Sequence, residues 1–139
     1  MRMADEVREA IQSGGNAIPF GRLLGFRPTH IEHGKAVVEL EVNASHHNPM
    51  GRLHGGALCS IADSAMGIAH ASVLTQGESG ATVDFRITFL RPVSEGKLTA
   101  TATMVKSGRT ISMLDCDVVD GSGKLIARAS GTFITTRTS

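Results

Sequence analysis

The spacing of hydrophobic and polar residues changes along the chain, and each change predicts a different element. Residues 4–13 repeat apolar side chains at helical spacing and end at Ser13-Gly14-Gly15, which predicts a short amphipathic helix. Residues 16–34 are predicted to be connecting structure. From residue 35 apolar residues alternate with glutamates as far as Val42, which predicts a half-buried strand.

A run of mostly small apolar residues from Gly55 to Leu74 is long enough to span a bilayer. It holds Asp63 near its centre, and a central Asp costs about 2.5–3.5 kcal/mol on membrane-insertion scales. We therefore predict the buried helix of a soluble protein. Two of its stripes are apolar, and the third is small and polar and contains Asp63.

Four strands joined by short turns are predicted after this helix: 81–90, 98–104, 109–119 and 124–135. In the first of them, Val83 is expected to share a face with Phe85, and Thr82 to lie on the opposite face. Short turns, above all Asp120-Gly121-Ser122-Gly123, favour antiparallel neighbours. A helix that is apolar on most sides must be covered on most sides. The predicted fold class is α+β, with five antiparallel strands wrapped around one long helix.

Composition narrows the function classes. The 139 residues fit a single domain, 1–139, with an N-terminal helix and connector over 1–19. The net charge of +1 provides no basic field for nucleic acid, so no nucleic-acid partner is expected. Cys59 and Cys116 form no CxxC pair and are expected to be buried in a reducing compartment. The acidic start of the chain does not fit a signal peptide, so the expected location is cytoplasmic, with no membrane partner.

The densest polar segment is the loop 46–56, which delivers the chain to the long helix. Gly55 and Gly56 stand at the helix start, where backbone N–H groups lack internal partners and the helix dipole is positive. Glycines there let another group approach the backbone closely, which suits an anion or a carbonyl oxygen becoming one. A tight loop-to-helix turn is the alternative explanation.

Asp63 lies about two turns inside the helix among apolar neighbours, where a carboxylate needs a partner or a task. The alternative is a structural hydrogen bond, either to a strand backbone or across a dimer. The histidines of the loop and Asp63 match no usual zinc spacing, so neither a metal nor any other cofactor is expected. The chain has no GxSxG elbow for a serine nucleophile.

These residues match a family. Segment 48–57 (NPMGRLHGGA), with Asp63 nine residues after His54, resembles the hotdog-fold acyl-CoA thioesterases. The subgroup includes the phenylacetate-degradation (PaaI-like) thioesterase, the menaquinone-pathway thioesterase and the mammalian small acyl-CoA thioesterase. The resemblance continues through 82–92 (TVDFRITFLRP) and 120–125 (DGSGKL), and covers roughly residues 20–135. It implies hydrolysis of an acyl-CoA or aroyl-CoA thioester.

The resemblance also implies roles for single residues. Asp63 matches the catalytic carboxylate, acting as general base on water or as nucleophile on the thioester. Gly55 matches the residue whose backbone N–H holds the oxyanion, while His54 and Asn48 match positions that polarise the thioester or orient water. Thr82 matches a hydroxyl that positions the water in some members.

The resemblance also implies which residues lie near coenzyme A and how copies of the chain assemble. Gly108 and Arg109, with Lys106 and Arg91, resemble the region near the nucleotide end of coenzyme A, where cations suit phosphates. The family builds its site across a homodimer, so Asp63 is expected to face the loop of the other subunit. A homotetramer is common in this subgroup.

Two other functions remain open from the residues. A hotdog hydratase or dehydratase pairs a His with an acid, and His70 is the candidate partner for Asp63. A non-catalytic acyl-CoA binding or sensing domain would use the same groove, but it has no need for a carboxylate beside the thioester. Two departures from the family also bear on the site. The short side chain of Asp63, where some members carry Glu, favours the base role, and Gly67 replaces a Ser found one turn after the acid.

Overall fold

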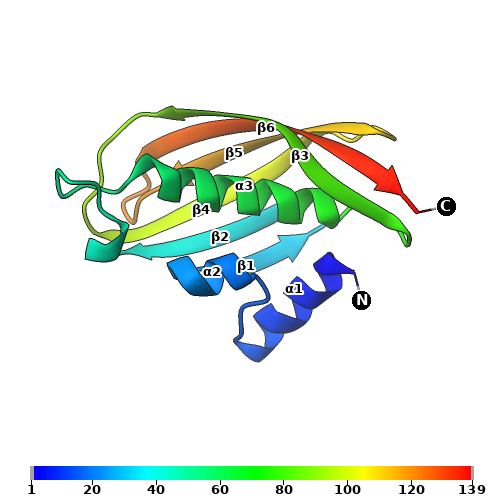
Figure 1. Cartoon of the computed structure of the whole chain (residues 1–139), viewed down its shortest axis with the longest axis horizontal. Coiled ribbons are helices and arrows are strands. Elements are labelled where there is room, and N and C mark those ends of the chain that lie inside the picture. The colour runs from blue at the N-terminus through cyan, green and yellow to red at the C-terminus, as the bar shows by residue number, and fades with distance from the viewer. Residues whose placement is uncertain (1, 139) are drawn as a thin grey trace.

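A six-stranded antiparallel sheet wraps around one long helix in the computed structural model, which describes residues 2–138 (Figure 1). The elements, in chain order, are α1 (Met3–Ser13), α2 (Pro19–Leu24), β1 (Phe26–Glu32), β2 (Lys35–Val42), the 3-10 turn η1 (Ala44–His46), α3 (Gly55–Ala71), β3 (Glu78–Phe89), β4 (Gly96–Lys106), β5 (Ile111–Val119) and β6 (Leu125–Arg137). The strand order across the sheet is β1-β2-β4-β5-β6-β3. The predicted α+β class and the wrapped helix are confirmed.

The core lies between α3 and the concave face of the sheet. Its centre is made of side chains with at most 1% exposure, among them Ile61, Met66 and Ile68 of α3 and Leu40, Leu98 and Leu114 of the strands. The helix buries the predicted apolar stripes except at Cys59, which is half-buried, and Asp63 on the third stripe is also half-buried. Within residues 2–138, no helix has the length and apolar character needed to cross a membrane.

The segment 16–34 is not merely a connector, and the prediction of five strands is wrong. Residues 16–34 form α2, a turn at Gly25 with φ +93°, and then β1 at the edge of the sheet. The pairing of β1 with β2 shifts between Pro28 and His30, so Thr29 is an extra residue. It interrupts the alternation of inward-facing and outward-facing side chains along the strand. Because of this bulge and the proline, the sequence pattern hides the strand.

A second bulge reverses the predicted faces at the start of β3. Thr82 pairs with Phe133 and Asp84 with Thr132, so Val83 is left out of the ladder. The extra residue puts Thr82 on the same side as Phe85, against α3, and leaves Val83 59% exposed. The expectation that Val83 faces inward with Phe85 is therefore wrong.

Candidate active site

The hydroxyl of Thr82 donates to the carboxylate of Asp63, with 2.9 Å between Oγ1 and Oδ1. Asp63 lies two turns into α3 on the half-buried stripe, and Thr82 reaches it because of the bulge in β3. The partner of the carboxylate is thus a strand side chain rather than the strand backbone that the structural alternative expected. Within residues 2–138, no ion pair includes Asp63.

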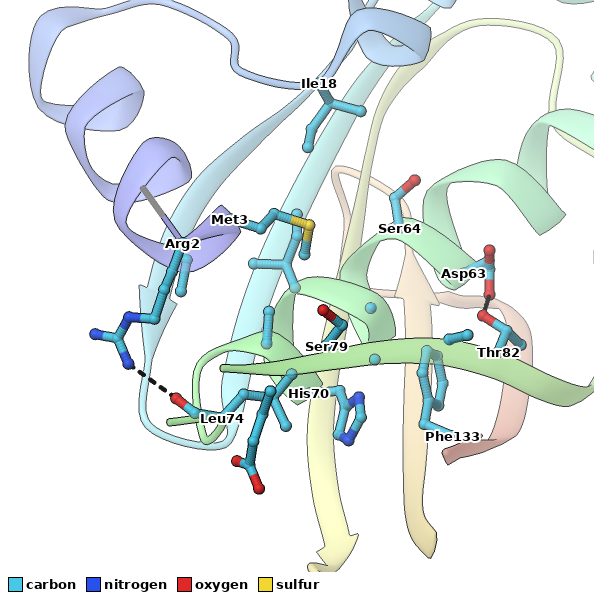
Figure 2. Close-up of a pocket in the computed structure, with 17 residues that line it drawn as sticks. Arg2, Met3, Ile18, Asp63, Ser64, His70, Leu74, Ser79, Thr82 and Phe133 are labelled. Carbon is cyan, nitrogen blue, oxygen red and sulfur yellow. Dashed lines mark hydrogen bonds between the residues drawn. The ribbon is translucent and has the colours of Figure 1, made fainter. Parts of the chain in front are cut away.

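This pair lies on the wall of a cavity of about 550 Å³ between α3, β3 and the N-terminal part of the chain (Figure 2). Ser64 stands next to Asp63, and the Phe133 ring forms part of the same wall. Met3 and Ile18 line the opposite side. The carboxylate is therefore reachable by a small molecule in the cavity.

The loop before α3 is held by its histidines. The Nε2 of His46 lies 2.6 Å from the Leu24 carbonyl oxygen, and its Nδ1 accepts from the Asn43 N–H. The Nε2 of His47 lies 2.7 Å from the Ser94 carbonyl oxygen. These rings face backbone carbonyls. Among the residues described, no group of three or more His, Cys, Asp or Glu is arranged to hold a metal ion.

Asn48 shapes the same loop from within. Its side-chain oxygen accepts from the N–H groups of Met50 at 2.9 Å and Arg52 at 3.3 Å, which closes a tight turn. Gly51 occupies the left-handed region of that turn with φ +76°. The amide oxygen of Asn48 is thus used in ordering the loop.

His54 caps α3, because its Nδ1 accepts from the Gly56 N–H at 2.8 Å. The neighbouring N–H of Gly55 has no acceptor among residues 2–138. The Phe89 ring lies over Gly55, and a Cβ at position 55 would come within 3.0 Å of its Cζ atom. A side chain at position 55 would therefore press on the Phe89 ring.

Gly55 and Asp63 do not meet within one chain. Eight residues of helix separate them, which is about 12 Å along the axis. Gly55 and Asn48 line a different cavity, of about 440 Å³, together with Phe89 and Arg91. One chain therefore holds the two halves of the expected site in separate places.

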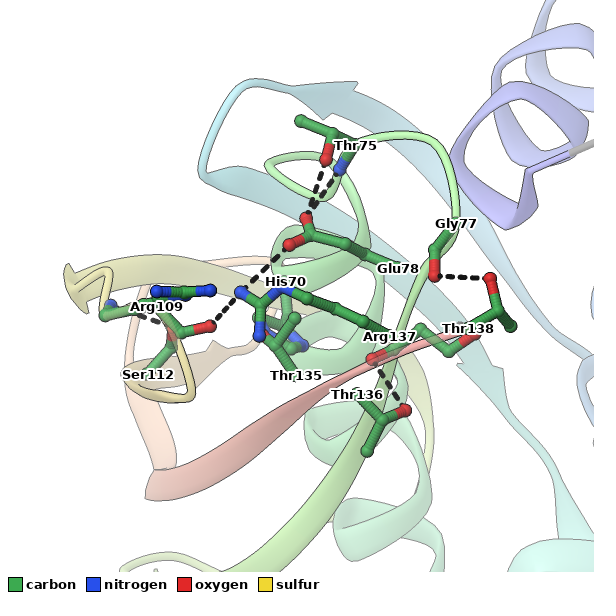
Figure 3. A network of polar contacts seen from close by, with 12 residues as sticks. His70, Thr75, Gly77, Glu78, Arg109, Ser112, Thr135, Thr136, Arg137 and Thr138 are labelled. Carbon is green, nitrogen blue, oxygen red and sulfur yellow. Dashed lines mark hydrogen bonds and ion pairs between the residues drawn. The ribbon is translucent and has the colours of Figure 1, made fainter.

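The cations expected near coenzyme A also divide between two places. Gly108 and Arg109 line a small cavity of about 90 Å³ with Arg137, whereas Arg91 lines the cavity beside Gly55. Lys106 is exposed at the end of β4. Figure 3 shows the network around Arg109, whose carbonyl accepts from Arg137, itself 3.0 Å from Oε2 of Glu78. No ion pair in the described part of the chain includes the Arg109 guanidinium, which leaves it available to an anion.

His70 is not the partner of Asp63. Its Nε2 lies 3.1 Å from the Thr135 hydroxyl, its ring lies against Phe133, and only 1% of the residue is exposed. Burial lowers the pKa of His70, and the charge of Glu78 opposes this effect. A neutral, structurally engaged imidazole does not favour the hydratase alternative, which needs His70 at Asp63.

Both cysteines are free, and Cys116 is buried as expected, whereas Cys59 is only half-buried. Burial raises the pKa of Cys116 to about 12, with Asp117 and Asp115 adding to the effect. The pKa of Cys59 is also raised, mainly by burial. Both thiols stay protonated near neutrality, so neither is a nucleophile.

The sequence alone did not indicate that Phe89 lies beside Gly55. The pattern gives Phe89 only as an inward residue of a strand, and nothing local links it to a glycine 34 positions earlier. The contact arises because β3 runs antiparallel to β6 and ends beside the start of α3. No signal in one sequence identifies such a pairing.

Known proteins are similar to this chain in sequence. Residues 50–127 match the family model of the thioesterase superfamily. Human acyl-coenzyme A thioesterase 13 is 32% identical over 133 residues, which is 94% of each chain. The 1,4-dihydroxy-2-naphthoyl-CoA hydrolase of Listeria monocytogenes is 31% identical, over 74% of this chain and 84% of its own.

A solved structure has the same fold. A variant of the phenylacetic acid degradation protein PaaI from Thermus thermophilus superposes with a TM-score of 0.78 at 32% identity, over 84% of this chain and 98% of its own. The hotdog fold and the resemblance to the PaaI-like subgroup are thereby confirmed. The chain belongs to the thioesterase superfamily, and with it to the enzymes that hydrolyse thioesters.

Proposed function

We propose that the protein hydrolyses acyl-CoA or aroyl-CoA thioesters to a free carboxylic acid and coenzyme A, at sites shared between two copies of the chain. Support comes from the relatives, one an acyl-coenzyme A thioesterase and another a CoA-ester hydrolase. No metal or organic cofactor is required by this chemistry.

The observation that carries the proposal is the carboxylate of Asp63 on the cavity wall. It accepts one hydrogen bond, from Thr82, and within residues 2–138 it pairs with no cation. A structural carboxylate inside a helix is normally neutralised by a partner charge or by several donors. Asp63 instead keeps its second oxygen free for chemistry in the cavity.

In the general-base route, Asp63 takes a proton from a water molecule while the water oxygen attacks the thioester carbonyl carbon. The carbonyl electrons move onto oxygen and form an oxyanion. When the oxyanion collapses, the carbon–sulfur bond breaks and the thiolate of coenzyme A leaves with the proton that Asp63 had taken. Thr82 holds the carboxylate in position throughout.

In the nucleophilic route, a carboxylate oxygen of Asp63 attacks the same carbon and expels the thiolate, which forms a mixed anhydride. Water then hydrolyses the anhydride and restores the carboxylate. The aspartate side chain is one methylene shorter than a glutamate and is fixed to β3 by Thr82, so we favour the base role.

The Gly55 N–H is proposed to hold the oxyanion, because it is unpartnered within the described chain and stands at the positive end of the α3 dipole. One such donor contributes about 3 kcal/mol in comparable oxyanion holes. Since Gly55 lies about 12 Å from Asp63 along the helix, the donor must come from a second copy of the chain.

The sheet offers a place for that second copy. β3 is 12 residues long, lies at the end of the strand order, and pairs only with β6 within residues 2–138. A long unpaired edge is a template for another strand. We propose a homodimer in which two β3 edges pair antiparallel, which sets the Asp63 of one copy toward the loop of the other. A homotetramer of two such dimers is the proposed assembly.

Coenzyme A is proposed to lie with its phosphates toward Arg109 and Lys106 of one copy and Arg91 of the other. The free guanidinium of Arg109 and the Gly108 turn beside it support this direction. The free thiols suit a reducing compartment, so we propose a cytoplasmic location.

The test is coenzyme A release from acetyl-, octanoyl-, benzoyl- and phenylacetyl-CoA, by wild type and by Asp63→Asn. We expect wild-type turnover and a loss of about a hundredfold or more in the variant, which is the scale of general-base contributions. Asp115→Asn, on the outer face of β5, is the matched control and should keep full activity. Binding of these thioesters without turnover by wild type would instead indicate the non-catalytic domain.

A further inference from the structure

The cavity at Asp63 follows α3 from Asp63 to Ala71 and reaches the N-terminal helix α1. At one end stand Asp63, Thr82 and Ser64, and at the other stand Met3 and Leu74 (Figure 2). From Asp63 to the end of α3 at Ala71, eight residues of helix span about 12 Å. The space therefore extends well beyond the reacting carbonyl.

The N-terminal helix α1 borders the far end of the cavity. The side chain of Met3 points from α1 into the space, and Ile18 of the following connector approaches it from the same side (Figure 2). The Arg2 guanidinium donates to the Leu74 carbonyl oxygen at 2.9 Å and ties the start of α1 to the end of the α3 region. Val7, fully buried, anchors the same helix to the core. The N-terminal segment therefore lines this end of the cavity, with Met3 still 43% exposed.

Apart from the hydroxyls of Ser64 and Ser79, the polar side chains around the cavity have partners within residues 2–138. Arg2 pairs with Asp5 as well as with a backbone oxygen, and Glu78 pairs with Arg137. The Nε2 of His70 faces Thr135. What remains toward the interior of the cavity is largely aliphatic or aromatic.

Gly67 keeps the middle of the cavity open. A Cβ at this position would meet only the Phe133 ring edge, at 3.9 Å, so a larger side chain has room to grow into the space. Gly67 lies one turn beyond Asp63 on the same stripe of α3, between the reacting end and α1.

We propose, resting on the proposed function, that this cavity holds the acyl group as an extended, medium-length aliphatic chain, and that Met3 and Ile18 of the N-terminal segment set the longest chain accepted. A benzoyl or phenylacetyl group is shorter than the cavity and leaves its apolar α1 end filled with water. An aliphatic chain that reaches α1 buries that surface, which favours binding in proportion to the area covered. The N-terminal segment is thus the specificity-determining element for acyl length.

The test compares kcat/KM for acetyl-, octanoyl- and palmitoyl-CoA in wild type and three variants. Wild type should prefer octanoyl-CoA. Gly67→Leu fills the middle of the cavity, so its octanoyl-CoA kcat/KM should fall at least about tenfold while the acetyl-CoA value changes less than about twofold, since methylene-sized misfits in apolar pockets have effects of this order. Ile18→Phe shortens the far end and should act in the same direction if Gly67→Leu does not fold. Met3→Ala lengthens the cavity and should raise the palmitoyl-CoA value relative to octanoyl-CoA.

Two matched controls lie away from the cavity: Gly121→Leu in an open turn and Met113→Ala on the outer face of β5. Both should keep the wild-type chain-length profile. A wild type that favours benzoyl- or phenylacetyl-CoA over octanoyl-CoA overturns the inference, and so do variants that lower all acyl-CoA substrates equally. Either result leaves the proposed hydrolase standing. A wild type inactive on every thioester is the separate failure of the proposed function.

Discussion

Thr82→Val removes the hydroxyl that donates to Asp63 and keeps the shape and β-branching of the side chain. The hydrogen bond is 2.9 Å long and its acceptor is a carboxylate, and bonds to charged groups contribute about 1.5–3 kcal/mol. Thr82 is exposed in the single chain, so we take the lower end. Because 1.36 kcal/mol is a factor of ten in rate, kcat should fall about tenfold. KM should hardly change, because the hydroxyl acts on the carboxylate rather than on the substrate.

The assay is steady-state release of coenzyme A from octanoyl-CoA, with Thr82→Ser and Thr88→Val measured beside it. Serine restores the donor, so kcat should return to within about threefold of wild type. This corresponds to a difference in activation free energy of less than about 1 kcal/mol. Thr88 pairs with Arg128 on the outer face of the same strand, so its variant should be unchanged. Equal activity of Thr82→Val and wild type would refute the positioning role, and so would a rise in KM at constant kcat.

Three further predictions concern pH, backbone space and thiols. Burial lowers the pKa of His70 when folded, so the unfolded chain binds that proton more tightly and stability is lost as pH falls below about 6.5. The urea midpoint of the wild type should drop between pH 7.5 and 5.5, and it should depend less on pH in His70→Gln. The same pH dependence in the wild type and in this variant would contradict the prediction. Gly108→Ala drives a Cβ into the Ile111 carbonyl oxygen and should lower the free energy of unfolding by about 2–3 kcal/mol, whereas Gly67→Ala, with open space, should be neutral or stabilising in chemical denaturation. The pKa of Cys116 is about 12, so a disulfide reagent at pH 8 should modify only Cys59 until the chain unfolds; rapid double modification contradicts this.

The elements that the sequence predicts well are those whose alternation is unbroken. Residues 35–42 alternate without interruption and coincide with β2, and the Asp120–Gly123 turn forms as expected, with the Asp120 carboxylate accepting from the Ser122 N–H at 2.9 Å. The long helix also forms, from Gly55 to Ala71 rather than to Leu74. In each case local chemistry and tertiary packing point to the same structure.

The two errors in the strands share one physical cause, the β-bulge. An extra residue at Thr29 hid β1, and another at Val83 reversed the face on which Thr82 lies. A bulge depends on how two strands pair, so one strand's sequence does not contain it. The resemblance to the family nonetheless selected Thr82, which the alternation alone assigned to the wrong side of the sheet.

The candidate site was predictable in its members but not in its assembly. Asp63 and Gly55 stand out as a carboxylate inside a helix and a glycine at a helix start, which are local signals. Their separation into two cavities follows from the rise of about 12 Å between them, and the contact of Phe89 with Gly55 follows from the path of β3. Only the folded chain brings out these relations.

The claim that one site takes Asp63 and Gly55 from different copies can be tested with mixed dimers. One chain carries Asp63→Asn and the other Gly55→Pro. Proline suits the first residue of a helix and lacks the N–H, so it removes the oxyanion donor. Its Cβ also presses on the exposed Phe89 ring, so Gly55→Ala, which adds a Cβ but keeps the N–H, is the matched control. Asp63→Asn and Gly55→Pro alone should each lose about a hundredfold or more in kcat.

The two chains are co-expressed with different tags, and the mixed dimer is purified through both. One of its two sites then combines an intact Asp63 with an intact Gly55, so we expect about half the wild-type kcat per dimer. If both groups served the same chain, every site would lack one of them. A mixed dimer as inactive as its parents would contradict the shared site.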